Sequence, residues 1–264
     1  MKTLVTPKAS AFSIWSIIFV MQSVFCVLQV LPRFRAKDMI QKGVGYSYIL
    51  TCISQVCWTL AFAYEIIWLA LIFMLMIWAS LLGLLYSQYY VKSEGTLFEF
   101  WFLRFPFAIH CGWLTAASAL NVNVLVVQQD ASAAVQLAVG IVSLAILHAI
   151  SVWVLFGIRR ANYTIASVLA WANGWIYAEL QSPKDSIVQR FSEDAVSGVS
   201  YAAVAVAFII AAQITIRAVT ELVRRLNTEE RRIDGVDTTR LTSPGVVTSR
   251  KSGDNVTETL DNTI

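Results

Sequence analysis

Polar side chains inside long apolar runs are the groups in this chain whose types could do chemistry, because a polar group in hydrocarbon is costly. The richest run covers residues 103–128. Four of its residues recur at helical spacing and would share one face: His110, Trp113, Ala117 and Asn121. An indole there could stack on a ligand, while the imidazole and the amide could orient its polar edges. The alternative is that the polar groups bond to neighbouring helices, at about 0.6 kcal/mol each. A second face carries small residues suited to close helix contact, at Gly112, Ala116 and Ala119.

The chain contains nine tryptophans. Trp68, Trp101 and Trp153 fall near the ends of apolar runs, where a belt of indoles at the membrane interface is the ordinary explanation. Six others fall deeper, at Trp15, Trp58, Trp78, Trp113, Trp171 and Trp175. Several indoles around one cavity would suit a large flat aromatic or polycyclic ligand, which gains from stacking and apolar burial. Packing of bulky rings in the core is a comparable alternative.

Catalytic and metal-binding patterns are absent from the sequence. The two histidines are too few for a three-histidine zinc site, and no His-Glu-x-x-His, Gly-x-Ser-x-Gly or glycine-rich phosphate loop occurs. A proton-driven pump normally needs buried acidic residues, whereas the two acidic candidates, Glu65 and Asp130, fall at predicted hairpin turns. We therefore expect no enzyme activity, no catalytic residue, no metal site and no required cofactor.

The elements that position these residues must be membrane-spanning helices. Apolar residues make up 57% of the chain and charged residues 14%, whereas a soluble domain carries about 25% charged residues. Residues 43–91 carry one formal charge, Glu65, and residues 105–158 carry one, Asp130. Because a span needs about 20 apolar residues, each of these stretches is long enough for a helical hairpin.

The predicted fold class is all-α, a polytopic transmembrane helix bundle of about seven spans within residues 1–226. The spans are predicted at 10–31, 46–64, 66–88, 103–128, 132–156, 163–180 and 197–219. The sixth is short and carries Asn173 and Gly174, so a re-entrant or interfacial segment is the alternative there. Lys and Arg residues gather on one side of the spans, which predicts a cytosolic C-terminus and an external N-terminus.

Residues 227–264 form a polar segment without apolar periodicity. Such a composition cannot bury enough apolar surface to fold alone, so we predict a disordered cytosolic tail. The net charge of +3 does not indicate nucleic acid as a partner, because the basic residues lie at span edges and in the tail. The predicted partners are membrane lipid and a small hydrophobic ligand, and a homodimer is the candidate assembly.

Three segments together resemble the TspO/translocator family, also called tryptophan-rich sensory or TspO/MBR-related proteins. Residues 11–19, Ala-Phe-Ser-Ile-Trp-Ser-Ile-Ile-Phe, resemble the family's aromatic-x-x-Val/Ile-Trp-x-x-x-Tyr segment. Gln55-x-x-Trp58 resembles its Asn-x-x-Trp, and Trp113 and Asn121 are spaced like the Trp and Leu-Asn of its last core helix. The resemblance covers residues 7–128, which implies a TspO-like core followed by extra C-terminal spans.

The chain departs from the family pattern at several points. The family's opening helix has no counterpart before residue 10, and Pro106 precedes Trp113 by seven residues instead of four. Ile72 replaces the usual acidic residue of the helix that matches the third span. Val122 and Val126 occupy the places of the Tyr and Arg of the sterol-contact motif, which argues against cholesterol handling.

The resemblance implies a protein that binds a flat hydrophobic ligand of the tetrapyrrole or porphyrin type, as a sensor, scavenger or carrier. The residues expected to line its pocket are Trp15, Gln55, Trp58, His110, Trp113 and Asn121. Haem is an alternative ligand, with His110 bound to the iron. Two other function classes stay open at this stage, a transporter of a small solute and a structural or assembly subunit of a membrane complex.

Overall fold

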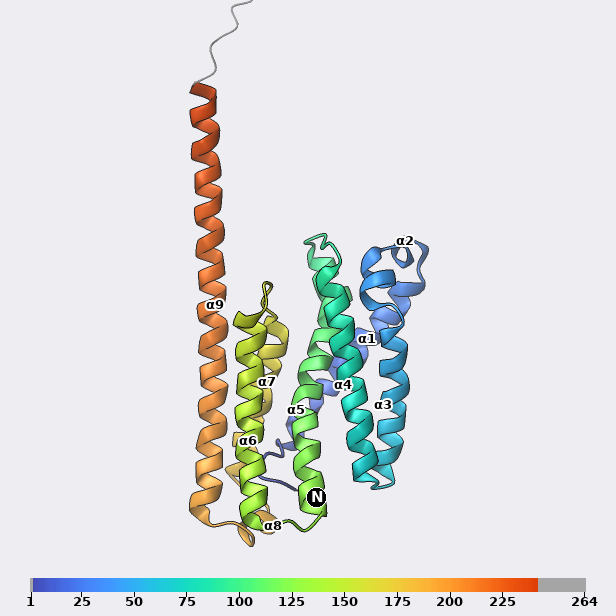
Figure 1. Ribbon diagram of the computed structural model, residues 1–264, viewed down its shortest axis with the longest axis vertical. Coiled ribbons are helices and arrows are strands. Elements are labelled where there is room, and N and C mark those ends of the chain that lie inside the picture. The colour runs from blue at the N-terminus through green and yellow to red at the C-terminus, as the bar shows by residue number, and fades with distance from the viewer. Residues whose placement is uncertain (1, 242–264) are drawn as a thin grey trace, which may run out of the picture. The chain divides into compact units, whose positions relative to one another are not determined.

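The structure is a computed structural model that describes residues 2–241. No strand occurs among these residues, and seven long helices make up most of the fold (Figure 1). They are α1 (Ile14–Val30), α3 (Ser47–Ala63), α4 (Ile67–Tyr90), α5 (Phe105–Gln128), α6 (Ala133–Val152), α7 (Tyr163–Leu180) and α9 (Glu193–Leu241). Short helical turns precede or connect them: η1 (Ala9–Ser13), α2 (Pro32–Arg35), η2 (Met39–Val44), η3 (Glu99–Arg104), η4 (Trp153–Gly157) and α8 (Asp185–Val188).

Each predicted span lies on one of these helices. Five helical stretches in the described chain are long and apolar enough to cross a membrane: Ala9–Val30, Ile67–Tyr90, Glu99–Gln128, Ala133–Gly157 and Glu193–Glu229. Helix α3 is also apolar but shorter, with 17 residues. The predicted helical membrane bundle is therefore confirmed, whereas the number of crossings, about seven, stays a prediction.

The tight turns of the bundle lie at the two isolated acidic residues. Glu65 separates α3 from α4 with φ of 58°, and Asp130 follows α5 with φ of 49°. The next helix, α6, begins after Ser132, whose side-chain oxygen accepts a hydrogen bond from the Val135 backbone N–H. Both predicted hairpin turns are thus confirmed, with a charged residue at each helix end.

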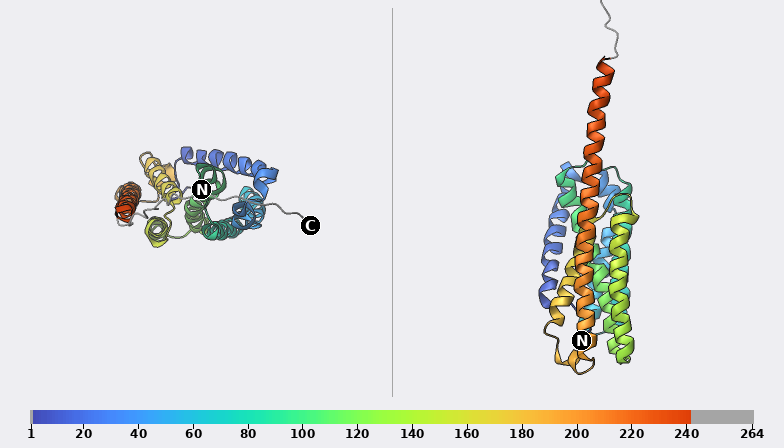
Figure 2. Two further views of the ribbon diagram at one scale, coloured as in Figure 1. Left: turned by 90° about the horizontal axis from the view of Figure 1, so that it is seen from above. Right: turned by 90° about the vertical axis from the view of Figure 1, so that its left-hand side faces the viewer.

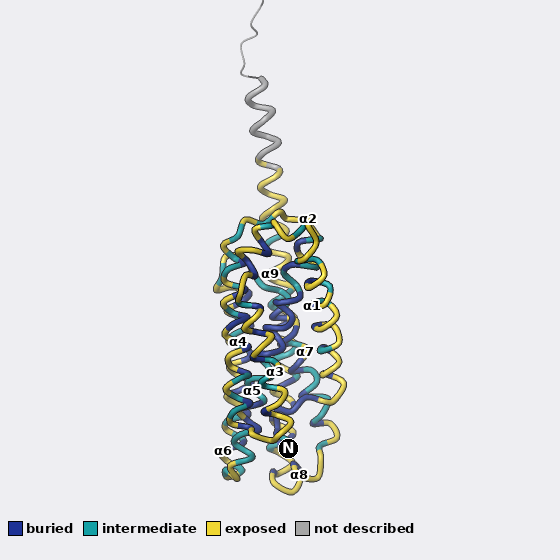
Figure 3. The backbone as a smooth tube through the Cα atoms, turned by 90° about the vertical axis from the view of Figure 1, so that its right-hand side faces the viewer, coloured by how far each residue is buried: buried dark blue, intermediate teal, exposed yellow. Residues whose placement is uncertain are grey.

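The outer faces of the helices are apolar and exposed (Figure 3). Val20 on α1, Ile53 on α3 and Phe208 on α9 are 61%, 57% and 72% exposed, respectively. In water, a continuous apolar surface of this kind would be a site of association. In hydrocarbon it carries no such penalty, so lipid is the medium that suits this surface.

Helix α5 lies at the centre of the bundle, where it contacts α1, α4, α6 and α7 (Figure 2). In its span 61% of the most apolar window is buried, compared with 28–39% in the other four spans. A Cβ added to Gly112 would lie 3.0 Å from the Val168 Cβ and 3.2 Å from the Ile165 Cα on α7. The predicted small-residue face therefore contacts α7 at Gly112, because the absence of a side chain there lets α7 approach α5.

The N-terminal segment before η1 is packed inside the bundle, although no pattern in its sequence predicts this. Residues 3–6 are buried, and the Lys8 backbone N–H donates to the Trp175 carbonyl oxygen at 3.0 Å. The Lys2 ammonium lies 2.8 Å from a Glu179 carboxylate oxygen. The segment thus fills space between helices instead of extending freely from the first span.

Helix α9 passes from the bundle unit, which ends at Ala218, into a second unit that begins at Val219. Residues 227–241 belong to helix α9 in the structure, whereas the sequence predicts a disordered tail from residue 227, and that tail stays a prediction. Adding residues to an existing helix avoids the cost of nucleation, and the Arg225–Glu221 ion pair at 2.8 Å supports the continuation. The rest of the predicted tail, 242–264, lies outside the described residues.

Candidate functional site

Trp15 is the centre of an aromatic cluster between α1, α3 and α5. Its ring lies 6.3 Å from that of Trp58 in a stacked arrangement with an interplanar angle of 26°. It meets His110 and Trp113 edge-on, at centroid distances of 5.6 Å and 6.4 Å. Phe12 and Trp113 form a T-shaped pair with ring centroids 5.4 Å apart. Four of the six residues predicted to line a pocket are therefore in direct ring contact, although they come from three helices.

His110 is held in one orientation by a hydrogen bond to Gln22. The Gln22 side-chain nitrogen lies 2.8 Å from His110 Nδ1 and 3.4 Å from the Pro106 carbonyl oxygen. A carbonyl oxygen only accepts, so this atom is the amide N–H₂ and donates to Nδ1 as well. In the neutral imidazole the proton then sits on Nε2. His110 thus presents an N–H donor from a side chain that is 1% exposed.

Several polar atoms of the cluster are buried without a hydrogen-bond partner among the described residues. The three donors are His110 Nε2, Trp58 Nε1 and Trp113 Nε1. Gln55 Oε1, one helical turn before Trp58 on α3, is an acceptor of the same kind. A buried unsatisfied polar group costs about 1–3 kcal/mol, so a ligand that paired with these atoms would remove part of that cost.

Two other deep tryptophans differ in this respect. Trp78 Nε1 donates to Thr115 Oγ1 at 2.9 Å, and Trp171 Nε1 donates to the Ala11 carbonyl oxygen at 3.4 Å. Their indole N–H groups are satisfied within the bundle, which suits a structural role. The contrast favours core packing for Trp78 and Trp171 and a binding role for Trp58 and Trp113.

Asn121 lies apart from the rings. It is eight residues beyond Trp113 on α5, which places it about 12 Å further along the helix axis. It is 4% exposed, and its Oδ1 has no partner among the described residues. No ring contact joins it to the aromatic cluster, so its place in the pocket stays a prediction.

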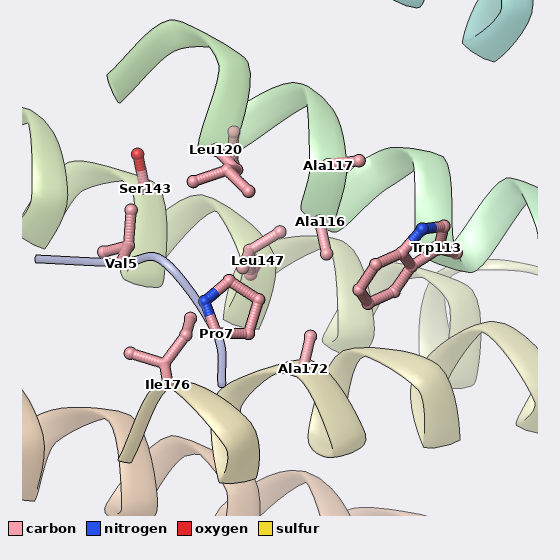
Figure 4. A pocket seen from close by; sticks show the side chains of 11 residues that line it. Val5, Pro7, Trp113, Ala116, Ala117, Leu120, Ser143, Leu147, Ala172 and Ile176 are labelled. Atoms are coloured by element: carbon pink, nitrogen blue, oxygen red, sulfur yellow. The ribbon is translucent and has the colours of Figure 1, made fainter. Parts of the chain in front are cut away.

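A small cavity of about 10 Å³ lies next to Trp113 (Figure 4). Pro7 and Val5 of the N-terminal segment form one wall, and Ala117 on α5 and Ala172 on α7 form others. This volume accommodates about one water molecule. The rings of the aromatic cluster are therefore in close contact, and a larger ligand would have to separate them.

The sequence of this chain matches the family model described as TSPO-like protein over residues 1–216. The chain belongs to the TSPO-like protein family. No curated protein and no solved structure gives a significant match. The matched region of this TSPO-like protein runs from the N-terminal segment to the first half of α9. It is longer than residues 7–128, on which the resemblance rests, so the family match includes the later helices α6 and α7.

Two features of this TSPO-like protein are not among the predicted site residues. The first is Gln22, which orients His110. The signal that could have indicated it is an amide side chain within the apolar run 10–31, where Gln29 is the other amide. A cleft of about 1270 Å³ lies beside α4, α5 and α7, and none of the rings of the aromatic cluster lines it. Its lining residues are scattered between positions 78 and 165, so no local sequence pattern indicates it.

The histidine of the aromatic cluster is the side chain there that could ligate a metal ion. No group of three His, Cys, Asp or Glu side chains among residues 2–241 could hold an ion. His110 could offer iron only Nε2, because Nδ1 accepts from Gln22. Ligation through Nε2 would move the proton to Nδ1, where it would meet the Gln22 N–H₂ group. The aromatic cluster is therefore better suited to donate hydrogen bonds than to bind a metal.

Proposed function

We propose that this TSPO-like membrane protein binds a flat hydrophobic ligand of the tetrapyrrole class at the aromatic cluster, as a sensor, scavenger or carrier. The observation that carries the proposal is the set of three buried N–H donors without partners on Trp58, His110 and Trp113. A flat ring system with acceptor nitrogens or carboxylates would satisfy these donors. The indole faces would stack on its apolar surface. Binding, and not catalysis, is the role that this set of groups supports.

A route into the cluster is available between α1 and α3. Trp15 stacks on Phe19 at 5.2 Å, and Trp58 stacks on Phe62 at 5.5 Å. Phe19 and Phe62 are 48% and 43% exposed, so each ring pair reaches from the bundle surface to the cluster. A planar ligand dissolved in the membrane could insert between the stacked rings of Trp15 and Trp58. Rotation of these side chains is a smaller change than separation of the α5–α7 contact.

The metal-free ring is the better ligand on chemical grounds. Haem would require His110 Nε2 as an unprotonated ligand and therefore a reversed Gln22 amide. The reversed amide would turn its oxygen, an acceptor, toward the Pro106 carbonyl oxygen 3.4 Å away. Protoporphyrin needs neither change. The proposal is therefore a porphyrin-like ring held by N–H donors, without an iron–histidine bond.

The experiment is a titration of purified protein with protoporphyrin, followed by tryptophan fluorescence quenching. We expect saturable quenching, and at least about tenfold weaker binding for Trp113→Ala, equivalent to the loss of one stacking contact with its hydrogen bond. Trp153→Ala is the matched control, because Trp153 is 56% exposed and lies outside the aromatic cluster. Its affinity should equal that of the wild type.

Trp58→Phe is a second variant for the case that Trp113→Ala does not fold. It preserves an aromatic ring and removes one hydrogen-bond donor, the indole N–H of Trp58. We expect Trp58→Phe to weaken porphyrin binding with an unchanged unfolding midpoint. Equal weakening by the Trp113 and Trp153 variants, or none by either, would show that the ligand does not use this cluster. Flux of a small solute in proteoliposomes without porphyrin binding would select the transporter class.

We also propose an external N-terminus and a cytosolic C-terminus. In a cysteine-free background, Asp185→Cys at the first residue of the short helix α8 should react with a membrane-impermeant maleimide in intact cells. Glu94→Cys, in the connection between α4 and η3, should react only after permeabilisation. Both side chains are exposed, so access from one side of the membrane decides the labelling. The opposite pattern would reverse the proposed orientation.

A further inference from the structure

The cleft of about 1270 Å³ beside α4, α5 and α7 is larger than the ~300–1000 Å³ typical of small-molecule pockets. It shares none of the six residues predicted to line the tetrapyrrole pocket. Its rim includes the exposed side chains of Tyr86, Tyr90 and Trp153, so it opens on the outer, lipid-facing surface of the bundle. An occupant could therefore enter it sideways from the membrane.

The cleft extends along one leaflet of the bilayer. On α5 its lining runs from Phe105 to Thr115, about 15 Å along the helix axis. This is half of the ~30 Å hydrocarbon thickness. The end of α4, the start of α5, the end of η4 and the start of α7 lie at the same end of the bundle, the upper end in Figure 1. One end of the cleft thus lies at headgroup depth and the other near the middle of the membrane.

Positive charge is concentrated at the headgroup end. Arg104, Arg159 and Arg160 line the cleft, and no Asp or Glu is among its lining residues. Arg104 Nε is paired with buried Glu99 at 2.5 Å, but Arg104 Nη2 is buried without a partner among the described residues. Arg159 and Arg160 are exposed, and neither forms an ion pair within residues 2–229. The end at headgroup depth is therefore suited to an anionic group.

The deeper part of the cleft is apolar. Leu82, Ala108 and Ile150 line it from three helices, and Gly83 leaves open space where a side chain would stand. Apart from its chain neighbours and the backbone of its own helix, no atom lies within 4 Å of a Cβ built on Gly83. An acyl chain would lie against this surface without leaving any polar group unpaired.

We propose that this cleft binds one anionic phospholipid of the leaflet that adjoins Arg159 and Arg160. Its phosphate lies at Arg104, Arg159 and Arg160, and an acyl chain extends along α4 and α5 toward Trp78 and Thr115. The combination of a cationic end, an apolar interior and a length of one leaflet matches a membrane lipid. A free phosphate would use only the headgroup end, and a compact apolar ligand would leave the arginines without a counter-charge.

The test is native mass spectrometry of the full chain after delipidation, with phosphatidylglycerol and phosphatidylcholine of identical acyl chains added back. We expect one phosphatidylglycerol molecule to be retained in preference to phosphatidylcholine. Arg159→Gln with Arg160→Gln should lower the affinity for phosphatidylglycerol roughly thirtyfold, as two surface charges do. The affinity for phosphatidylcholine should change far less. The matched control is Arg33→Gln with Arg35→Gln, an exposed arginine pair on α2 outside the cleft.

A second pair of variants tests the apolar part. Gly83→Trp should fill the cleft and lower the retention of both lipids, whereas Gly174→Trp on α7 should not. Gly174 also has nothing within 4 Å of an added Cβ but does not line the cleft. Unfolding midpoints close to wild type for both variants separate cleft filling from misfolding.

Four results would overturn the proposal. The first is equal retention of the two lipids by wild-type protein, and the second is an unchanged preference in the Arg159/Arg160 variant. Displacement of phosphatidylglycerol by millimolar glycerophosphate would assign the site to a free phosphate compound instead. Displacement by protoporphyrin, one for one, would assign the cleft to the tetrapyrrole. The lipid measurement does not depend on porphyrin binding at the aromatic cluster. Either proposal can therefore be overturned while the other stands.

Discussion

Glu99→Ala is expected to lower the stability of the bundle by about 3–5 kcal/mol, because it leaves a largely buried arginine without its partner. The Glu99 side chain is 3% exposed and lies 2.5 Å from Arg104 Nε. Its carboxylate also accepts hydrogen bonds from the Ser93 hydroxyl at 2.9 Å and from the Glu94 backbone N–H. One substitution therefore removes an ion pair and two further hydrogen bonds that hold η3 against the end of α4.

The measurement is thermal unfolding of purified protein in detergent, followed by tryptophan fluorescence. Glu94→Ala is the matched control, because Glu94 pairs with Lys37 at the surface and its side chain is 50% exposed. Exposed pairs contribute about 0–1 kcal/mol, so this variant should unfold close to wild type. Similar loss of stability in both variants would mean that burial does not strengthen the Glu99–Arg104 pair.

Gly112→Leu is expected to have the second large effect, because it forces α5 and α7 apart at a close contact between them. A Cβ at position 112 already lies 3.2 Å from the Ile165 Cα, which is a backbone atom and cannot rotate away. Overpacking of this kind costs about 1–3 kcal/mol, and more where the backbone must move. Because Trp113 follows directly on α5, the shift should also weaken porphyrin binding at the aromatic cluster.

Unfolding midpoints of Gly112→Ala, Gly112→Leu and Gly174→Leu test this expectation. We expect a graded loss from alanine to leucine at position 112, because the side chain grows toward Val168 and Ile165. Gly174→Leu should be neutral or stabilising by up to about 1 kcal/mol, since leucine is the better helix former and space is available. Equal stability of the two leucine variants would show that α5 and α7 are not held in close contact.

The helices of this protein could be predicted from composition alone, because hydrocarbon restricts a chain more than water does. Every backbone polar group in a membrane must be paired within its own segment, so a long apolar run has one structure available. The segment predicted at 163–180 has the bounds of helix α7, whereas its crossing of the membrane stays a prediction. Residues 227–241 continue helix α9 although their composition predicts disorder, because composition describes whether a segment can fold alone and not whether a preceding helix continues into it.

The aromatic cluster could be predicted only in part. Their depth in the spans and the family resemblance predict Trp15, Trp58 and Trp113 as a group, and Trp15 is in ring contact with each of the other two. Trp78 differs from them because its indole N–H donates a hydrogen bond to Thr115, which lies 37 positions away on another helix. Periodicity assigns a residue to a face of its own helix, but it does not say which neighbouring side chain that face meets.

The sequence by itself determined the medium, the helices and the set of polar and aromatic residues within them, because these depend on local composition and on the cost of burying polar groups. The tertiary structure decided which of those residues meet. It joined Gln22 to His110, inserted the N-terminal segment between helices, and brought Arg104, Arg159 and Arg160 to one cleft. Such contacts depend on how helices pack through glycines and bulky rings, and that packing is a property of pairs of helices that no single segment encodes.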